Sequence, residues 1–157
     1  MKKSIILVCL ATIVIVSCQH FSYSDTKTLN GGAWNRFEPI AFEFDITKPD
    51  QATDIWLIAT FDTAIYRAAK LPLVVKMIGT NGERRQFRSE IVVVDKKGQL
   101  CGEVTPSGLI ECRQKIRNNF YFNTKGQHRM EVSQGTTKYD IRGIGEIGLH
   151  LEKSKSE

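Results

Sequence analysis

The amino-acid sequence predicts an all-β domain, an antiparallel β-sandwich of the jelly-roll or immunoglobulin-like type. Short apolar or alternating segments recur about every 8–12 residues, and turn-forming Gly, Asn, Asp and Pro residues separate them. Sustained helical periodicity is almost absent. The composition agrees, because 157 residues with 41% hydrophobic and 25% charged side chains are typical of one ordinary globular domain.

The first strands are predicted from their side-chain patterns. Residues 40–46 alternate between apolar and polar side chains, which indicates a strand with one buried face. Residues 54–61 are apolar on both faces and predict a central strand. Residues 63–70 contain several alanines and are compatible with one or two helical turns.

A hairpin is predicted in the middle of the chain. Residues 71–78 and 84–94 have strand-like composition, and Pro72 fits only at the start or edge of its strand. Asn81-Gly82 between them favours a type I′ turn, because both residues accept a positive φ. Further strands are predicted over residues 99–104, 109–116 and 128–133, and the closing strands over residues 144–151.

The start of the chain has the features of a bacterial export signal. After a basic beginning, residues 5–16 are uncharged and apolar. This run is too short to cross a membrane, which takes about 20 residues, but it has signal-peptide length. The run ends in Ile15-Val16-Ser17-Cys18, which resembles the lipobox of bacterial lipoproteins. We therefore predict a lipoprotein signal peptide over residues 1–17 and lipidation of Cys18; the alternative is an ordinary secretory signal with an unrelated Cys.

Lipidation at Cys18 would define where the protein resides. Two or more acyl chains anchor a protein stably, whereas one does so only marginally. Gln19 follows the Cys without an acidic cluster, which by analogy with bacterial sorting signals favours the outer membrane, with the domain facing the periplasm. Residues 18–36 are polar and aperiodic and predict a tether after the lipidated Cys, followed by a β-sandwich over residues 37–152 and a polar tail over residues 153–157.

The net charge of +5 does not indicate a nucleic-acid partner. Removal of residues 1–17 takes away two of the 22 basic residues and none of the 17 acidic ones, so the net charge falls to +3. Location and charge together therefore argue against nucleic acid. We expect the basic clusters to be solvated turns and strand faces, the alternative being a patch for anionic lipid or glycan. These clusters are Arg84, Arg85 and Arg88; Lys96 and Lys97; and Arg113, Lys115 and Arg117.

A glycine motif near the C-terminus looks like a dinucleotide-binding fingerprint. Residues 143–148 spell G-x-G-x-x-G, but only nine residues follow Gly148. A dinucleotide site needs a helix and a returning strand after the glycines. We therefore expect these glycines to permit a bend and close packing before the final strand.

Two cysteines form a candidate disulfide. Cys101 and Cys112 flank the turn at Pro106-Ser107-Gly108, and an oxidising periplasm permits a bond between them. Such a bond would stabilise the fold by ~3 kcal/mol. The alternative is two buried thiols. We expect no zinc site, because neither a C-x-x-C motif nor a nearby histidine pair accompanies them.

No catalytic motif stands out. The sequence lacks H-E-x-x-H, G-x-S-x-G and Walker-type patterns, and His128 and His150 fall on different predicted strands. We expect a protein that is not an enzyme and needs no metal or cofactor, although scattered carboxylates leave a glycosidase-type pair open. Five aromatic residues are either a sugar-stacking platform or core and rim side chains: Trp34, Trp56, Tyr66, Tyr121 and Tyr139.

Two stretches carry a resemblance to a known family. Residues 120–132 read FYFNTKGQHRMEV and residues 141–152 read IRGIGEIGLHLE. A lipobox, Trp34, the strand at residues 40–44 and the turn at residues 95–98 precede them in order. The chain thus resembles the GldH family of gliding-motility lipoproteins from Bacteroidota, although residues 66–70 and 100–104 depart from its pattern.

The resemblance implies a non-enzymatic, lipid-anchored component of gliding-motility or cell-envelope machinery. It carries over no catalytic residues, and it implies that the protein acts through envelope protein partners. A lipid-anchored glycan-binding module, using the exposed aromatic residues, is the alternative function.

Overall fold

The computed structural model describes residues 22–155. Within them the chain forms eleven strands and one short 3-10 helix, η1 (Asn30–Gly32). The strands are β1 (Ser22–Thr28), β2 (Ala33–Asn35), β3 (Ile40–Ile46), β4 (Thr53–Phe61), β5 (Lys70–Ile78), β6 (Arg84–Val92), β7 (Glu103–Val104), β8 (Ile110–Phe120), β9 (Gly126–Gln134), β10 (Asp140–Arg142) and β11 (Ile144–Lys153).

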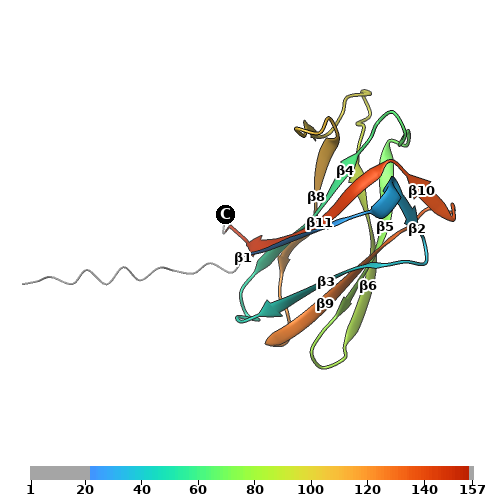
Figure 1. The fold of residues 1–157 in the computed structure, drawn as a ribbon. Helices are drawn as coiled ribbons and strands as arrows, with labels where there is room; N and C mark the ends of the chain where they lie inside the picture. The colour runs from blue at the N-terminus through green and yellow to red at the C-terminus, as the bar shows by residue number, and fades with distance from the viewer. Residues whose placement is uncertain (1–21, 156–157) are drawn as a thin grey trace, which may run out of the picture.

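The strands form two sheets that face each other, as Figure 1 shows. One sheet has the order β1-β11-β4-β8-β7 and the other the order β3-β9-β5-β6, and every strand pair is antiparallel. Strands β2 and β10 form a separate two-stranded ribbon. The prediction of a single all-β sandwich is confirmed.

The strand pairing selects the jelly roll from the two predicted topologies. Eight strands pair from the outside inwards: β1 with β11, β3 with β9, β4 with β8, and β5 with β6. This nesting is that of one long antiparallel hairpin rolled into two sheets, which is a jelly roll. Immunoglobulin domains group their strands differently, with the third strand in the sheet opposite the first.

The core lies between the inner faces of the two sheets. Strand β3 buries Phe42, Phe44 and Ile46 and exposes Glu43 and Asp45, as its alternation predicts. Strand β4 lies between β11 and β8 and is largely buried on both faces, which confirms the predicted central strand. The largest fully buried side chains include Trp34, Phe42, Phe61, Leu57, Met130 and Leu149.

The alternating strand directions give the sandwich two ends. We call one of them the proximal end. It contains the start of β1, the end of β11, and the loops that connect β3 to β4, β5 to β6, and β8 to β9. At the distal end lie four connections, which join β1 to β3, β4 to β5, β6 to β8, and β9 to β11. The proximal start of β1 is at the left of Figure 1, and the distal ribbon of β2 and β10 is at the right. The distal connections are residues 29–39, 62–69, 93–109 and 135–143.

The predicted tether over residues 18–36 is wrong from Ser22 onwards. Strand β1 pairs with β11 along its whole length, from Ser22 opposite Glu152 to Thr28 opposite Glu146. Its sequence lacks an apolar pattern because β1 is an edge strand that exposes most of its side chains. Backbone hydrogen bonds to β11 hold it in place, so strand β1 belongs to the domain whose predicted start is residue 37.

Two local predictions also need correction. Residues 63–70 form no helix; the Asp62 carbonyl accepts hydrogen bonds from the N–H groups of Ile65 and Tyr66, which makes a single turn. The β5–β6 hairpin is confirmed, but its turn is not type I′, because only Gly82 has a positive φ, of 78°. Its N–H donates to the Gly79 carbonyl at 3.0 Å. The positive φ therefore falls on the residue that follows the turn, as in a hairpin with a glycine bulge.

The glycines of residues 143–148 permit close packing, as predicted, but Gly145 and Gly148 lie within the final strand β11 rather than before it. Strand β11 shifts register against β4 between Ile144 and Ile147. A Cβ added at Gly145 would lie 2.8 Å from Thr60 Oγ1, and one added at Gly143 would lie 2.7 Å from the Tyr66 backbone nitrogen. These glycines therefore serve close packing within the final strand and its approach.

Gly143→Ala is expected to destabilise the fold more than Gly31→Ala. Both glycines have positive φ, 86° and 74°, so both variants carry the same left-handed strain. Only Gly143 faces backbone atoms, because nothing lies within 4 Å of an added Cβ at Gly31. Overpacking should add about 1–3 kcal/mol at Gly143. Urea unfolding of the two variants measures this difference, and equal midpoints would contradict the packing role.

Candidate functional site

The predicted lipidation residue, Cys18, and the signal peptide over residues 1–17 lie outside the described residues. The described chain nevertheless starts a strand at Ser22, four positions after Cys18. In the part of the chain from 22 to 155, no helix is both long and apolar enough to cross a bilayer.

A buried carboxylate fastens the proximal end. Asp54 is only 5% exposed, and three donors converge on it from β8 and from the segment after β11. Lys115 Nζ lies 2.5 Å from Oδ2, the Asn119 N–H donates to Oδ1 at 3.0 Å, and the Ser154 hydroxyl also donates to Oδ1. Burial alone would raise the pKa of Asp54, but the hydrogen bonds from Lys115, Ser154 and Asn119 outweigh it and lower the pKa. Ser154 thus belongs to the fold rather than to a polar tail that begins at residue 153.

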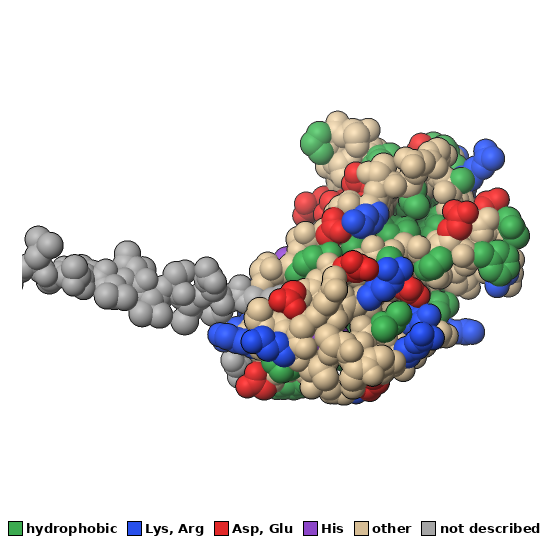
Figure 2. Space-filling model, turned by 60° about the horizontal axis from the view of Figure 1, so that its bottom comes forward, with side chains coloured by type: hydrophobic (Ala, Val, Ile, Leu, Met, Phe, Trp, Pro, Cys, Tyr) green, Lys and Arg blue, Asp and Glu red, His purple; other side chains and the backbone are tan. Residues whose placement is uncertain are grey.

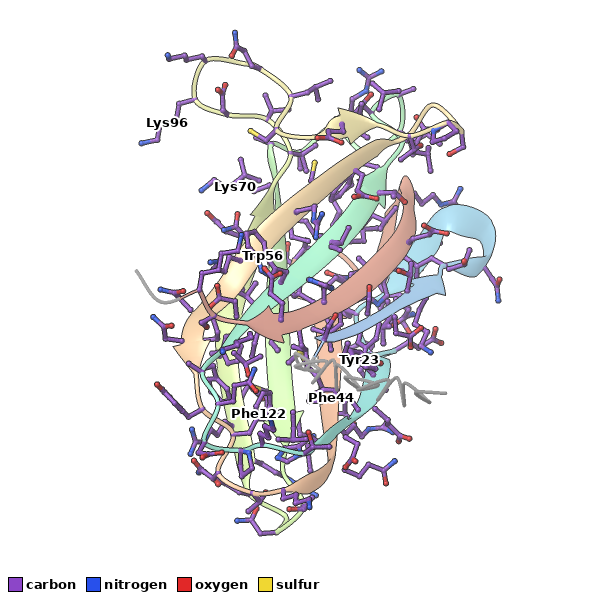
Figure 3. All side chains as sticks on the ribbon, turned by 90° about the vertical axis from the view of Figure 1, so that its left-hand side faces the viewer. Tyr23, Phe44, Trp56, Lys70, Lys96 and Phe122 are labelled. Carbon is purple, nitrogen blue, oxygen red and sulfur yellow. The ribbon has the colours of Figure 1, made fainter. Side chains whose placement is uncertain are left out.

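Trp56 lies beside this carboxylate on the outer face of the five-stranded sheet (Figure 3). Its indole N–H donates to Glu152 Oε1 at 2.9 Å. Lys115 Nζ lies 4.9 Å from the ring centre, and the guanidinium of Arg113 lies 6.0 Å from it. These cations occupy the surroundings of the ring, so Trp56 is part of a charged cluster rather than a free stacking surface.

The stretch 120–132, which carries the family resemblance, closes the proximal end of the core. The centre of the Phe122 ring lies 4.9 Å from the ring centre of Phe120, 5.7 Å from that of Phe44 and 5.2 Å from that of His128. Tyr23 of β1 adds a contact to Phe44 at 5.4 Å, and Figure 3 shows these two side by side. His128 Nδ1 lies 2.9 Å from the Gly126 carbonyl. This aromatic cluster explains the motif as a packing feature.

The five candidate platform aromatics do not share a surface. Trp34 is 1% exposed and Tyr66 is 7% exposed, so both belong to the core. The remaining three lie on different parts of the molecule. Trp56 is on the outer sheet face, Tyr121 lines a small proximal hollow with His128, and Tyr139 packs against Phe37 at the distal end.

The predicted Cys101–Cys112 disulfide is not formed, and both thiols are free. The register explains why. Glu103 opposes Glu111 in the β7–β8 pair, which places Gly102, not Cys101, opposite Cys112. A Cβ at Gly102 would lie 2.9 Å from Cys112 Sγ. Burial, with smaller effects of Cys101 and Glu111, raises the pKa of Cys112 to about 11.

The remaining carboxylates with shifted pKa values are paired with cations. On the outer face of the four-stranded sheet, Glu131 contacts Arg129 Nε at 2.9 Å and Lys76 Nζ at 3.3 Å. Burial raises the pKa of Glu131, but the hydrogen bonds from Arg129 and Lys76 outweigh it, so the pKa is lowered. Across residues 22–155 no group of three His, Cys, Asp or Glu side chains has the arrangement of a metal site.

The distal end gathers exposed hydrophobic side chains. Five of the six exposed large hydrophobic residues in the described chain lie in its four connections. The five are Phe37, Ile65, Leu100, Val104 and Tyr139, and the sixth is Tyr121 at the proximal end. Figure 2 shows green side chains with charged neighbours at its right-hand end, where the ribbon of β2 and β10 lies. The sequence contains no signal for this surface beyond large apolar residues in segments that read as turns.

A groove runs beside this surface. It has a volume of about 460 Å³ and lies between residues 65–68 and strand β10. Its charged lining residues are Arg67, Lys138, Asp140 and Arg142. Next to it the Phe37 and Tyr139 rings meet edge to face at 5.5 Å, and the Arg36 guanidinium lies 5.4 Å from the Phe37 ring centre.

The fold and its surfaces define a small jelly-roll β-sandwich that follows a lipobox-like segment. A family model described as GldH lipoprotein matches residues 22–151, and the chain belongs to this family. The sequence resemblance is thereby confirmed, and the matched region coincides with the described domain.

Comparison with other proteins adds little beyond the family. No curated protein matches the chain. The crystal structure of the infectious bursal disease virus VP2 subviral particle is 11% identical, with a TM-score of 0.43, and the match covers 87% of this chain and 33% of that one. The structure of infectious bursal disease virus Gt strain is 12% identical, with a TM-score of 0.27, covering 87% of this chain and 36% of that one. This chain thus spans about a third of the length of either, and at these TM-scores the likeness carries no argument.

Proposed function

We propose that the protein is an outer-membrane lipoprotein, anchored through acyl chains on Cys18, that serves gliding-motility or cell-envelope machinery through protein partners. The observation that carries the proposal is the family match, which begins at Ser22, four positions after the lipobox residue Cys18. The domain faces the periplasm in this proposal, as the absence of an acidic cluster after Cys18 favours.

The start of β1 makes the anchor short. Four residue steps from Cys18 to Ser22 span at most about 14 Å. The seven residues of β1 then rise about 23 Å towards the distal end. A lipidated Cys18 therefore keeps the proximal end close to the membrane and turns the distal end away from it. The protein would present a fixed surface to a partner, which a long flexible tether would not do.

We further propose that the protein is not an enzyme. A general acid needs a carboxyl group whose pKa is raised. The carboxyl groups of Asp54, which is buried, and Glu131, which is half-buried, have lowered pKa values instead, because Lys115, Arg129 and Lys76 bind them. These arrangements are typical of ion pairs that hold strands together, and they support a role in contact rather than in catalysis.

The test is complementation of a deletion strain. Deleting the gene is expected to abolish surface spreading of the bacterium that carries it, and the wild-type chain is expected to restore spreading. A Cys18→Ala chain should fail to do so because it lacks the anchor. Cys9→Ala is the matched control, since Cys9 lies within the predicted signal peptide. Normal spreading of the deletion strain would refute the proposed role.

A further inference from the structure

The distal end differs from the proximal end in what it exposes. Each of the four distal connections carries at least one exposed large hydrophobic side chain, although they are far apart in sequence. Phe37 is 67% exposed, Tyr139 is 62% exposed and Val104 is 72% exposed. The Phe37 and Tyr139 rings are in contact, and Ile65 lines the groove beside strand β10. Exposed apolar side chains with charged neighbours are typical of protein interaction sites. The grouping follows from the jelly-roll topology, which brings these connections to one end.

The groove at this end favours a negatively charged ligand. Three cations line it, Arg67, Lys138 and Arg142, against one carboxylate, Asp140. Within residues 22–155 none of these three cations forms a salt bridge, and neither does Arg36 beside Phe37. Arginine with neighbouring aromatic side chains is the usual composition of the energetically important part of an interface.

We propose that the distal end is a docking surface for an envelope protein that presents an extended segment with apolar side chains and carboxylates. This inference rests on the proposed function, because the anchor at Cys18 turns the distal end away from the membrane. Apolar side chains of the segment would cover Phe37, Tyr139 and Ile65, and its carboxylates would pair with Arg67, Lys138 and Arg142.

Other occupants fit the surface less well. A second copy in a two-fold interface would present the same three cations and single carboxylate, and so would not supply enough negative charge to complement the groove. A glycan would need an aromatic ring face to stack on, but the Phe37 and Tyr139 rings stand at 65° to each other, edge to face. In the proposed anchoring, the short link from Cys18 to β1 holds the opposite end at the membrane, so a lipid surface is not the occupant we propose for the distal end. An acidic, partly apolar protein segment satisfies both the charge and the exposed hydrophobic area.

Photo-crosslinking of the full chain in living cells tests the docking surface. A benzoylphenylalanine side chain would replace Phe37 or Tyr139, and in the control it would replace Tyr121, which is 55% exposed at the proximal end. We expect both distal positions to capture one protein, through a segment that mass spectrometry identifies as rich in Asp or Glu. The Tyr121 position should give at least tenfold less of that adduct.

Charge reversal then tests the groove. The double variant Arg67→Glu and Arg142→Glu is expected to reduce the Phe37 adduct at least tenfold. Arg84→Glu is the matched control, because Arg84 is exposed on β6 and has no salt bridge within the described chain. The inference would be overturned if Arg84→Glu reduced the Phe37 adduct as much as the double variant does. It would also be overturned if the Tyr121 position gave the same adduct in equal yield, if the captured protein were a second copy of this chain, or if neither distal position gave an adduct.

Membrane attachment is measured on the same variants, so that the two proposals fail separately. The charge-reversed chain should remain in the membrane fraction and lose surface spreading. If it remains anchored and spreading is normal, the docking inference fails while the anchored role stands. If the wild-type chain itself is not membrane-bound, the proposed function fails.

Discussion

Asp54→Ala is expected to lower the free energy of unfolding by about 3 kcal/mol. The substitution removes the acceptor for Lys115, the Asn119 N–H and the Ser154 hydroxyl at once. Ser154 is buried, so its hydroxyl would lose a partner without regaining water. Urea unfolding of the unlipidated mature chain measures the effect. Asp45→Ala, an exposed carboxylate on β3, is the control and should change stability by less than about 0.5 kcal/mol.

The same carboxylate predicts a dependence on pH. The pKa of Asp54 is lower in the folded chain than in the unfolded one. Its contribution is therefore fully present above the unfolded value of about 3.9 and is lost as the pH falls through the folded value. The stability difference between wild type and Asp54→Ala should shrink below about pH 4. A difference that is the same at neutral and acidic pH would show that the charge of Asp54 is not involved.

Trp34→Ala is expected to lower the free energy of unfolding by about 4 kcal/mol. Trp34 is 1% exposed and joins the β2–β10 ribbon to the core, and its indole N–H donates to the Glu38 carbonyl at 3.0 Å. The loss combines the removed apolar surface with the cavity that remains. Trp34→Phe keeps an aromatic ring and should cost about half as much. Both are measured by urea unfolding.

Amide exchange locates the effect of Trp34. Exchange in β2 and β10 should accelerate more than exchange in β4, because the ribbon has only two strands and depends on this contact. The ribbon would not depend on Trp34 if the free energy of unfolding of the Trp34→Ala chain were within about 1 kcal/mol of the wild-type value. The same would follow if amide exchange accelerated equally in all strands.

The sequence predicts strands where the burial pattern is regular and misses them where it is not. Residues 40–46 and 54–61 are found because their buried faces require apolar side chains. Strand β1 is missed because an edge strand needs only backbone pairing, and its polar side chains look like a tether. The disulfide between Cys101 and Cys112 is absent because the strand register places Gly102, one residue from Cys101, opposite Cys112. The spacing of two cysteines around a turn does not determine that register.

The candidate docking surface illustrates a different limit. Phe37, Ile65 and Tyr139 lie in separate connections, and each alone is an unremarkable exposed residue. Only the strand order of the jelly roll places these connections at one end. The family, in contrast, is recognised from the sequence, because the residues in the stretch 120–132 that pack the proximal core lie consecutively in the chain.

Metabolic labelling with palmitate, combined with membrane fractionation, tests the lipid anchor at Cys18 most directly. The wild-type and Cys9→Ala chains should carry label and remain in the membrane fraction. The Cys18→Ala chain should carry no label and leave the membrane, because it lacks the thiol to which the proposed acyl chains are attached. Labelled palmitate on the Cys18→Ala chain would contradict the account, since the lipid would then be attached elsewhere.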